Sequence, residues 1–273
     1  MLTQAEKGKA FRALHQRNRA FIIPNPWDAG SARMLAHLGF EALATTSSGY
    51  AYSAGTVDGK VSRENMMKHV AALAAATDLP VSADLENGYG DAPETAAETI
   101  RLAADAGVAG GSIEDWGGSG NGRIYDLGLA TERVRAAAEM ARSLPFPFTF
   151  TARAENYLHG RPDLKDTIAR LQAYQEAGAD VLYAPGLTTK DEIATVLKSV
   201  DRPVNVLMGI AGMPFSLAGL SAMGVRRISV GGALYRAAIG GFLRAAREMR
   251  EKGTFGFTKE AANSKEIAEM LGK

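Results

Sequence analysis

Ala177-Gly178-Ala179, closely followed by the apolar run Val181-Leu182-Tyr183, shows how this chain joins a helix to a strand. A stretch with helical spacing ends in a glycine, and a short apolar segment begins. Glycine reaches the left-handed backbone conformation that closes a helix without steric cost. The same join recurs at residues 38–40, 106–108 and 223–225. Each of the four therefore predicts the end of a helix and the start of a strand.

Proline marks a second kind of join. Pro80, Pro147 and Pro203 each follow a helical stretch and precede an apolar segment, as expected where proline ends a helix. Together with an initial apolar run, the two kinds of join predict strands at residues 21–23, 42–44, 81–83, 111–113, 148–150, 181–183, 204–206 and 228–230.

Strict alternation of short strands with helices implies parallel pairing, and eight such units in ~250 residues is the size of a (β/α)8 TIM-type barrel. We predict a single barrel domain over residues 1–273, and a doubly wound open sheet is the alternative. Residues Gln4 to Arg17 are expected to form an extra helix outside the barrel. Residues 254–273 are expected to form a C-terminal helical extension containing a helix from Ser264 to Leu271.

Composition narrows the range of partners. The 273 residues carry 31 Lys and Arg against 30 Asp and Glu, a formal charge of +1, which gives no electrostatic footprint for nucleic acid or an anionic membrane. Partners are expected to be small molecules or further copies of the chain. The absence of Cys excludes disulfides and thiolate nucleophiles. No apolar run approaches the ~20 residues needed to span a bilayer, and the first residues are polar, so we predict a soluble cytoplasmic protein.

Two acids follow the predicted strand at 81–83. Along an extended segment alternate residues point the same way, so Asp84 and Glu86 can present oxygens to one cation, and 87–90 supply the turn that leaves the strand. Hard oxygen donors at this spacing suit Mg²⁺, or alternatively Mn²⁺. A solvated acidic turn is the competing interpretation of this fragment taken alone.

The other predicted strands also end in polar residues. In a parallel barrel these ends meet at one rim, where active sites gather. Carboxylates crowded at one rim repel one another and are costly to desolvate, which favours a divalent cation among them. The rim residues are Asn25 to Asp28, Thr45 to Tyr50, Asp58, Asp84, Glu86, Glu114, Asp115, Arg153, Glu155 and Tyr183.

Five of these motifs, taken together, resemble the isocitrate lyase and phosphoenolpyruvate mutase superfamily, with the likeness running from about Phe21 to Arg236. They are Asn25 to Gly30, Thr46 to Gly49 with the later Asp58, Asp84 to Gly90, Ile113-Glu114-Asp115, and Thr151 to Glu155. The resemblance implies a Mg²⁺ cofactor bound by Asp84, Glu86 and Glu114, largely through water.

The resemblance also implies the roles of the substrate-binding residues. Ser47, Ser48 and Gly49 would hold a carboxylate or oxyanion, Asp58 would lie near the reacting group, and Arg153 would clamp the substrate. Asp58 and Arg153 are the predicted catalytic residues. Asp84 and Glu155 are counted with the substrate-binding residues, Glu155 as a supporting group.

Other features separate this chain from well-known relatives. Isocitrate and methylisocitrate lyases carry a catalytic cysteine in the loop after the fourth strand, and this chain has none. Many relatives have a lysine directly after the Glu-Asp pair, where Trp116 stands here. The glycine-rich segment Trp116 to Gly122 predicts a mobile lid. The sequence does not identify which residue of this segment acts as the general acid or base.

These observations lead to a functional hypothesis. We expect a Mg²⁺-dependent lyase or decarboxylase acting on a small 2-oxo or 2-hydroxy mono- or dicarboxylate, in which the metal stabilises an enolate. A phosphonopyruvate mutase or hydrolase is one alternative, and a non-catalytic 2-oxo acid binding protein is another. Relatives commonly form tetramers by exchanging a late helix, so a homo-oligomer, dimer or tetramer, is expected.

Overall fold

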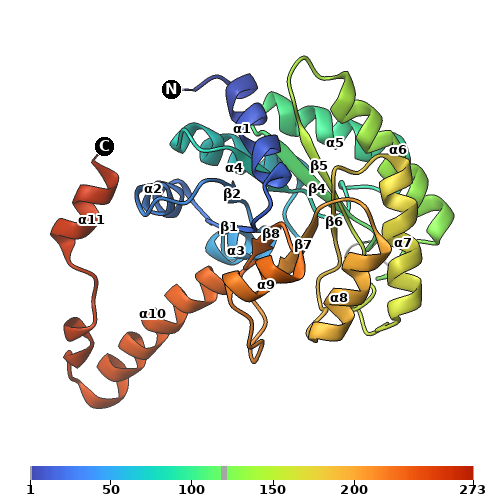
Figure 1. Cartoon of the computed structure of the whole chain (residues 1–273). Helices are drawn as coiled ribbons and strands as arrows, with labels where there is room; N and C mark the ends of the chain where they lie inside the picture. The colour runs from blue at the N-terminus through green and yellow to red at the C-terminus, as the bar shows by residue number, and fades with distance from the viewer. Residues whose placement is uncertain (1, 118–121, 273) are drawn as a thin grey trace.

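The strands form the predicted barrel. The computed structural model describes residues 2–117 and 122–272. Its strands are all parallel and pair in the order β1-β8-β7-β6-β5-β4-β3-β2. The two ends of this order approach each other where the Ala44 amide donates to the Pro24 carbonyl at 3.0 Å, so the barrel is nearly closed (Figure 1). The bounds are β1 Phe21–Ile23, β2 Leu43–Ala44, β3 Val81–Asp84, β4 Gly110–Glu114, β5 Thr149–Arg153, β6 Val181–Tyr183, β7 Val204–Leu207 and β8 Arg227–Ser229.

Helices alternate with the strands and cover the outside of the barrel (Figure 1). Two of the predicted glycine joins are plain in the backbone, because α7 ends at Gly178 with φ 109° and α9 ends at Gly224 with φ 103°. None of the described helices is long and apolar enough to cross a membrane. The bounds are α1 Gln4–Gln16, α2 Ala29–His37, α3 Ser47–Ser53, α4 Arg63–Ala76, α5 Pro93–Asp105, α6 Leu127–Ser143, α7 Leu164–Ala177, α8 Lys190–Ser199, α9 Leu217–Met223, α10 Ala233–Lys252 and α11 Ser264–Leu271, with a 3-10 turn η1 at Gly256–Lys259.

The apolar core lies between the strands and the helices. The outward residues of the strands, such as Phe150 and Leu182, are buried against helix residues such as Ile100 and Leu171. Burial of this apolar surface is the main favourable contribution to folding. The barrel is therefore stabilised from outside, which leaves its interior free to carry polar side chains.

The N-terminal helix α1 lies outside the strands, as predicted. Phe11 and Leu14 pack on Phe21, Ile23 and neighbouring small residues in a second apolar cluster. The ammonium group of Lys7 donates to the carbonyls of Ala74 at 3.3 Å and Thr77 at 2.7 Å. This helix contacts the residues where strands begin, at the end of the barrel opposite the predicted site.

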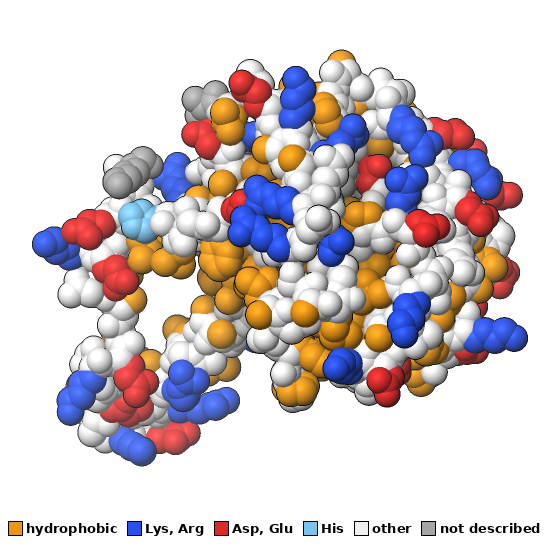
Figure 2. All heavy atoms as spheres, viewed as in Figure 1, with side chains coloured by type: hydrophobic (Ala, Val, Ile, Leu, Met, Phe, Trp, Pro, Cys, Tyr) orange, Lys and Arg blue, Asp and Glu red, His pale blue; other side chains and the backbone are white. Residues whose placement is uncertain are grey.

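The C-terminal segment leaves the barrel as an arm, defined here as α10, η1 and α11. Figure 1 shows α10 pointing away from the barrel and α11 returning beside α2. No residue of α10 is buried. In Figure 2 the arm stands off the body of the molecule and carries many charged side chains. The predicted C-terminal helix is confirmed, with its bounds at Ser264–Leu271.

Candidate active site

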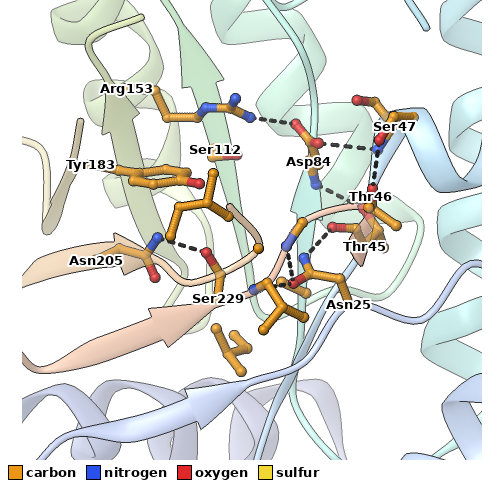
Figure 3. A pocket seen from close by; sticks show the side chains of 18 of the residues that line it. Asn25, Thr45, Thr46, Ser47, Asp84, Ser112, Arg153, Tyr183, Asn205 and Ser229 are labelled. Atoms are coloured by element: carbon orange, nitrogen blue, oxygen red, sulfur yellow. Dashed lines mark hydrogen bonds and ion pairs between the residues drawn. The ribbon is translucent and has the colours of Figure 1, made fainter. Parts of the chain in front are cut away.

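A cavity of about 300 Å³ opens at the carboxyl ends of the strands and reaches into the barrel (Figure 3). Five of the predicted site residues line it, namely Ser47, Ser48, Asp58, Asp84 and Arg153. The remaining four predicted residues, Gly49, Glu86, Glu114 and Glu155, are not among the residues that line it. The topology therefore brings side chains from β3, β5 and the loop after β2 to one opening.

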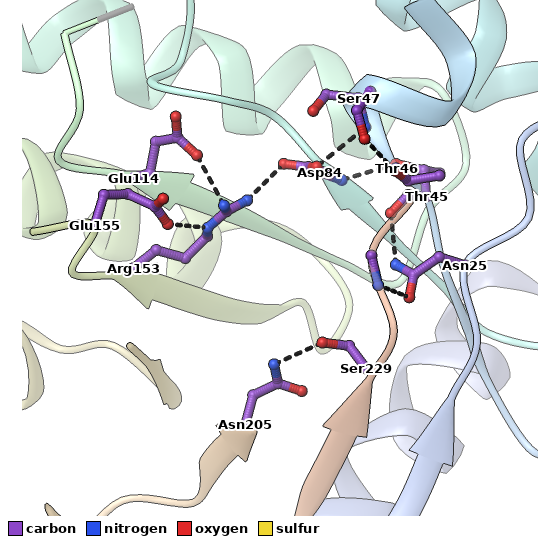
Figure 4. A network of polar contacts seen from close by, with 12 residues as sticks. Asn25, Thr45, Thr46, Ser47, Asp84, Glu114, Arg153, Glu155, Asn205 and Ser229 are labelled. Atoms are coloured by element: carbon purple, nitrogen blue, oxygen red, sulfur yellow. Dashed lines mark hydrogen bonds and ion pairs between the residues drawn. The ribbon is translucent and has the colours of Figure 1, made fainter. Parts of the chain in front are cut away.

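Arg153 is the centre of the charged residues at this opening (Figure 4). Its Nη1 lies 2.9 Å from Asp84 Oδ1, its Nη2 lies 3.1 Å from Glu114 Oε2, and its Nε lies 2.8 Å from Glu155 Oε1. Strand register explains part of this arrangement, since Glu114 on β4 stands directly opposite Arg153 on β5. Three carboxylates from three segments thus surround one guanidinium, so the cluster carries excess negative charge.

Burial sets the protonation of this cluster. It raises the pKa of Glu114 well above its ordinary value, with the charge of Arg153 opposing, and it raises the pKa of Glu155 in the same way. For Arg153 itself, burial works to lower the pKa, but the three carboxylates outweigh it and raise the pKa well above the ordinary value. Arg153 is therefore a permanent cation, whereas its acids are costly to ionise all at once.

The environment of the Glu86 carboxyl group shows whether these residues suit a metal ion. Its Oε1 is buried without a hydrogen-bond partner. Burial, and then the charges of Asp84 and Asp58, raise the pKa of Glu86 to about 8. A carboxylate oxygen that is buried, unpartnered and repelled by its neighbours is a suitable ligand for a hard divalent cation.

The side chains at this site do not form a complete set of metal ligands by themselves. Within the described ranges, no three His, Asp or Glu side chains are arranged to hold a metal ion by themselves. Mg²⁺ usually keeps several waters and takes only one or two protein carboxylates. The residues therefore fit an ion that completes its shell with water or ligand oxygens, and the ligand set Asp84, Glu86 and Glu114 stays a prediction.

The loop after β2 contributes α3 and its N-cap. The Gly49 amide donates to Thr46 Oγ1 at 3.2 Å, and the Ser47 amide donates to Asp84 Oδ2 at 3.1 Å. Both amides are thus used within the protein, and the Ser48 hydroxyl, 3.2 Å from Thr46 Oγ1, belongs to a residue that lines the cavity. The predicted oxyanion role of the three residues stays a prediction.

Asp58 lies at the mouth of the cavity, exposed to solvent. Partial desolvation, followed by the negative charge of Asp84, raises the pKa of Asp58 above its ordinary value. Hydrogen bonds from Ser47 and Gly59 oppose this rise. A carboxyl group with a raised pKa beside a cavity is suited to holding and returning a proton.

The predicted lid, Trp116 to Gly122, is described only in part, since 118–121 lie outside the described residues. At its base Trp116 pairs with Ile124 in an antiparallel bridge. The indole of Trp116 stacks on the imidazole of His159, with ring centroids 3.6 Å apart and planes 7° apart. His159 Nε2 lies 3.8 Å from Glu155 Oε2, so the base of the segment contacts the Arg153 cluster through one histidine.

The structure adds positioning residues that the sequence analysis did not assign. The side chain of Asn25 donates to the Thr45 carbonyl at 2.9 Å and accepts from the amides of Val230 at 3.0 Å and Gly231 at 2.9 Å. It thereby joins the ends of β1, β2 and β8. The sequence shows that Asn25 follows the first strand. It does not show the hydrogen-bond partners, because two of them lie about 200 residues further along the chain.

Asp115, grouped with the rim acids, has a supporting position. It is buried and accepts hydrogen bonds from the Glu155 amide at 2.8 Å, Arg170 Nη1 at 3.0 Å and the Tyr174 hydroxyl at 2.6 Å. With its oxygens engaged in this way, Asp115 fixes the backbone that carries Glu155.

The sequence analysis also did not predict that polar side chains line the barrel interior below the Arg153 cluster. TIM-barrel interiors are usually filled with bulky branched residues, whereas here polar side chains share the cavity lining with Ile23 and Leu207. The phenol ring of Tyr183 lies under Arg153, 5.2 Å from the guanidinium carbon to the ring centre. The sequence signal was the alternation of polar with apolar residues along the strands. The polar lining residues of these strands are Ser82, Ser112, Asn205, Arg227 and Ser229.

Comparisons with known proteins agree with this geometry. Residues 11–250 match the family model of phosphoenolpyruvate phosphomutase. A crystal structure from Burkholderia cenocepacia J2315, described as a candidate lyase/mutase, is 62% identical, with a TM-score of 0.96 over 99% of this chain and 97% of that one.

Two further relatives have named activities. An oxaloacetate decarboxylase of Pseudomonas savastanoi pv. phaseolicola is 29% identical over 89% of this chain and 84% of its own length. The structure of 2,3-dimethylmalate lyase, a member of the PEP mutase/isocitrate lyase superfamily, is 26% identical, with a TM-score of 0.86 over 100% of this chain and 95% of that one. The chain therefore belongs to the phosphoenolpyruvate phosphomutase family and is an enzyme of the isocitrate lyase and phosphoenolpyruvate mutase type.

Proposed function

We propose that this enzyme is a Mg²⁺-dependent lyase or decarboxylase that acts on a small 2-oxo or 2-hydroxy carboxylate. The observation that carries the proposal is the Arg153 cluster, in which Asp84, Glu114 and Glu155 surround one guanidinium beside a cavity. The likeness to an oxaloacetate decarboxylase supports a carbon-carbon bond as the one that breaks.

Arg153 would orient the substrate. A guanidinium has five N–H donors, and the carboxylates of the described residues engage three of them, one on Nε and one on each Nη. One N–H therefore remains on Nη1 and one on Nη2. The remaining N–H groups can donate to the oxygens of a substrate carboxylate, which would fix its orientation as well as balance its charge.

Asp58 would manage a proton at the mouth of the cavity. Its raised pKa keeps the protonated form available at a higher pH than is usual for an aspartate, so its Oδ atoms can give a proton to, or take one from, the substrate. Ser48, whose hydroxyl lies 3.2 Å from Thr46 Oγ1, is placed to donate to a substrate oxygen on the same side.

Asp84, Glu86 and Glu114 would hold the metal, largely through water. When bound, Mg²⁺ would supply Lewis-acid stabilisation of negative charge on the substrate's keto oxygen. The cluster residues contribute the negative charge that keeps the ion in place, and Arg153 prevents the acids from repelling the substrate carboxylate.

A parallel assay tests the proposed function. Oxaloacetate and phosphonopyruvate are each incubated with the enzyme and Mg²⁺, with and without EDTA. We expect oxaloacetate to be consumed, EDTA to stop the reaction, and added Mg²⁺ or Mn²⁺ to restore it. Turnover of phosphonopyruvate alone would replace the proposal with the carbon-phosphorus alternative.

Two variants sharpen this assay. Asp58→Asn is expected to lower turnover by about a hundredfold or more, because a positioned acid or base contributes on that scale. Asp201→Asn, at an exposed site on the opposite end of the barrel, is the matched control and should leave turnover unchanged. Turnover of neither substrate by the wild type, or turnover indifferent to EDTA, would count against the proposal.

We also propose a homo-oligomer, a dimer or tetramer, in which the arm packs on another copy. The support is that α10 buries no residue in the single chain, while Phe242 and Phe255 are 65% and 64% exposed. Phe242 lies on α10 and Phe255 lies just beyond its end, and large exposed aromatic side chains of this kind mark an interaction surface. Light scattering should give the mass of at least two chains at micromolar concentration, and a monomer would refute this expectation.

A further inference from the structure

A second arginine lies deeper in the cavity, on β8. Arg227 is 5% exposed and lines the cavity below the Arg153 cluster. Its Nε donates to Asn205 Oδ1 at 3.0 Å, and its Nη1 donates to Thr151 Oγ1 at 3.1 Å. Both acceptors are neutral side chains, Asn205 on the adjacent strand β7 and Thr151 on β5 across the barrel interior, so they position the guanidinium without neutralising it.

Arg227 has no acidic partner among the described residues. The buried Arg170, by contrast, pairs with Asp115 at 3.0 Å and Asp166 at 2.9 Å. The buried Arg133 donates to several backbone carbonyls and also stacks over the Tyr125 ring. Among the arginines that the structure describes, Arg227 alone combines deep burial, neutral partners and a position on the cavity wall.

The charge on Arg227 persists despite its burial. Burial, helped by repulsion from Arg153, lowers the pKa of Arg227 to about 10, with Tyr183 opposing. The guanidinium is therefore still protonated at neutral pH. An uncompensated buried charge is strongly unfavourable unless a partner arrives, and the cavity is the route by which an anion can reach it.

The cavity is thus divided by charge. Around Arg153 the three paired carboxylates give an excess of negative charge, which suits a cation and the 2-oxo acid end of a substrate. Around Arg227 the charge is positive and unbalanced. A ligand that satisfied both regions would carry a metal-chelating end and, at its other end, a second anionic group.

We propose that Arg227 binds the distal anionic group of the substrate, so that the enzyme selects small 2-oxo or 2-hydroxy acids with two acidic ends. This inference rests on the proposed function, whose substrate class it narrows.

Binding of malate and lactate tests this inference, since the two 2-hydroxy acids differ by one carboxylate. Isothermal titration is carried out in Mg²⁺ with the full-length enzyme, with phosphonopyruvate against pyruvate as a second pair that distinguishes a phosphonate end from a carboxylate end. We expect wild type to bind malate about 30-fold or more tightly than lactate, because losing one partner of a buried charge pair is costly on that scale.

Two substitutions separate binding from support of the fold. Arg227→Gln keeps an amide donor for Asn205 but removes the charge, and should weaken malate about 30-fold while leaving lactate within about threefold. Arg227→Lys keeps the charge without the planar fork and should retain part of the preference for malate. Because Arg227→Gln removes an unpaired buried charge, its melting temperature without ligand should be equal to or above that of wild type.

The possible results of these titrations distinguish failure of the Arg227 inference from failure of the proposed function. The inference is overturned if Arg227→Gln weakens the binding of malate and lactate equally, or if the wild type binds the two acids equally. In either case the proposed function still stands. A wild type that binds neither acid in Mg²⁺ overturns both. If only phosphonopyruvate shows the Arg227-dependent preference, the carboxylate version of the distal group is excluded.

Discussion

Arg153→Gln is expected to abolish turnover, lowering it by about a thousandfold or more, and to destabilise the protein. The substitution removes the guanidinium that pairs with Asp84, Glu114 and Glu155. Breaking a buried ion pair by removing one partner typically costs about 3–5 kcal/mol, because the remaining charge is buried and unpaired. Steady-state kinetics and thermal unfolding measure the two effects.

The stability lost by Arg153→Gln should depend on metal. Mg²⁺ can neutralise the carboxylates that the arginine leaves unpaired, so added Mg²⁺ should recover part of the melting temperature without recovering turnover. Arg101→Gln is the control, since Arg101 pairs with Glu98 and Asp105 on the exposed surface and should change stability by less than about 1 kcal/mol. Retained turnover in Arg153→Gln would show that the arginine does not bind substrate.

Glu86→Gln is expected to stabilise the metal-free enzyme and to destabilise it relative to wild type when Mg²⁺ is present. In EDTA at pH 8 the gain should be about 4 kcal/mol, because burial makes the ionised Glu86 carboxylate unfavourable in the folded wild type and the variant has no such group. In saturating Mg²⁺ the wild type gains the free energy of metal binding, and the variant, lacking one ligand oxygen, gains less. The order of the two melting temperatures should therefore reverse.

The pH dependence of this gain has a definite sign. In the unfolded chain Glu86 titrates near 4.5, whereas in the folded enzyme burial raises its pKa to about 8. Between these values the folded state binds a proton that the unfolded state has lost, so wild type loses stability as the pH rises through this window. The advantage of Glu86→Gln should be absent below pH 4.5 and complete above pH 8.

Thermal unfolding across this pH range in EDTA checks the prediction. Glu139→Gln on the exposed face of α6 is the matched control and should show no such pH-dependent gain. A melting temperature of Glu86→Gln that stays below wild type in EDTA at every pH would mean that Glu86 makes a favourable contact in the metal-free enzyme.

The barrel could be predicted from sequence because its signals are local. A glycine such as Gly178 ends a helix through its own backbone conformation, and a proline such as Pro203 stops a helix regardless of what lies far away. Seven such joins, together with the initial apolar run, predict eight strands that alternate with helices, and this alternation specifies a parallel arrangement. The convergence of Asp84, Glu114 and Arg153 then followed from one rule, that parallel strands present their carboxyl ends at the same rim.

The interior of the site could not be predicted in the same way. Whether Asn205 and Thr151 both reach Arg227 depends on the register of strands that are distant in the chain. Whether Arg227 has an acidic partner depends on every side chain around the barrel axis. The alternation of polar residues along β3, β4 and β7 was visible, but alternation alone does not distinguish a ligand cavity from a hydrogen-bonded core.

The direct test of the central claim is a titration with Mn²⁺ followed by electron paramagnetic resonance, comparing wild type with Asp84→Asn and Glu114→Gln. If the carboxylates crowd around Arg153 in order to hold a divalent cation, wild type should bind one Mn²⁺ per chain, Mg²⁺ should displace it, and each substitution should weaken binding by about 10-fold to 100-fold. A wild type that leaves Mn²⁺ free in solution, or variants that bind it as tightly as wild type, would contradict the claim.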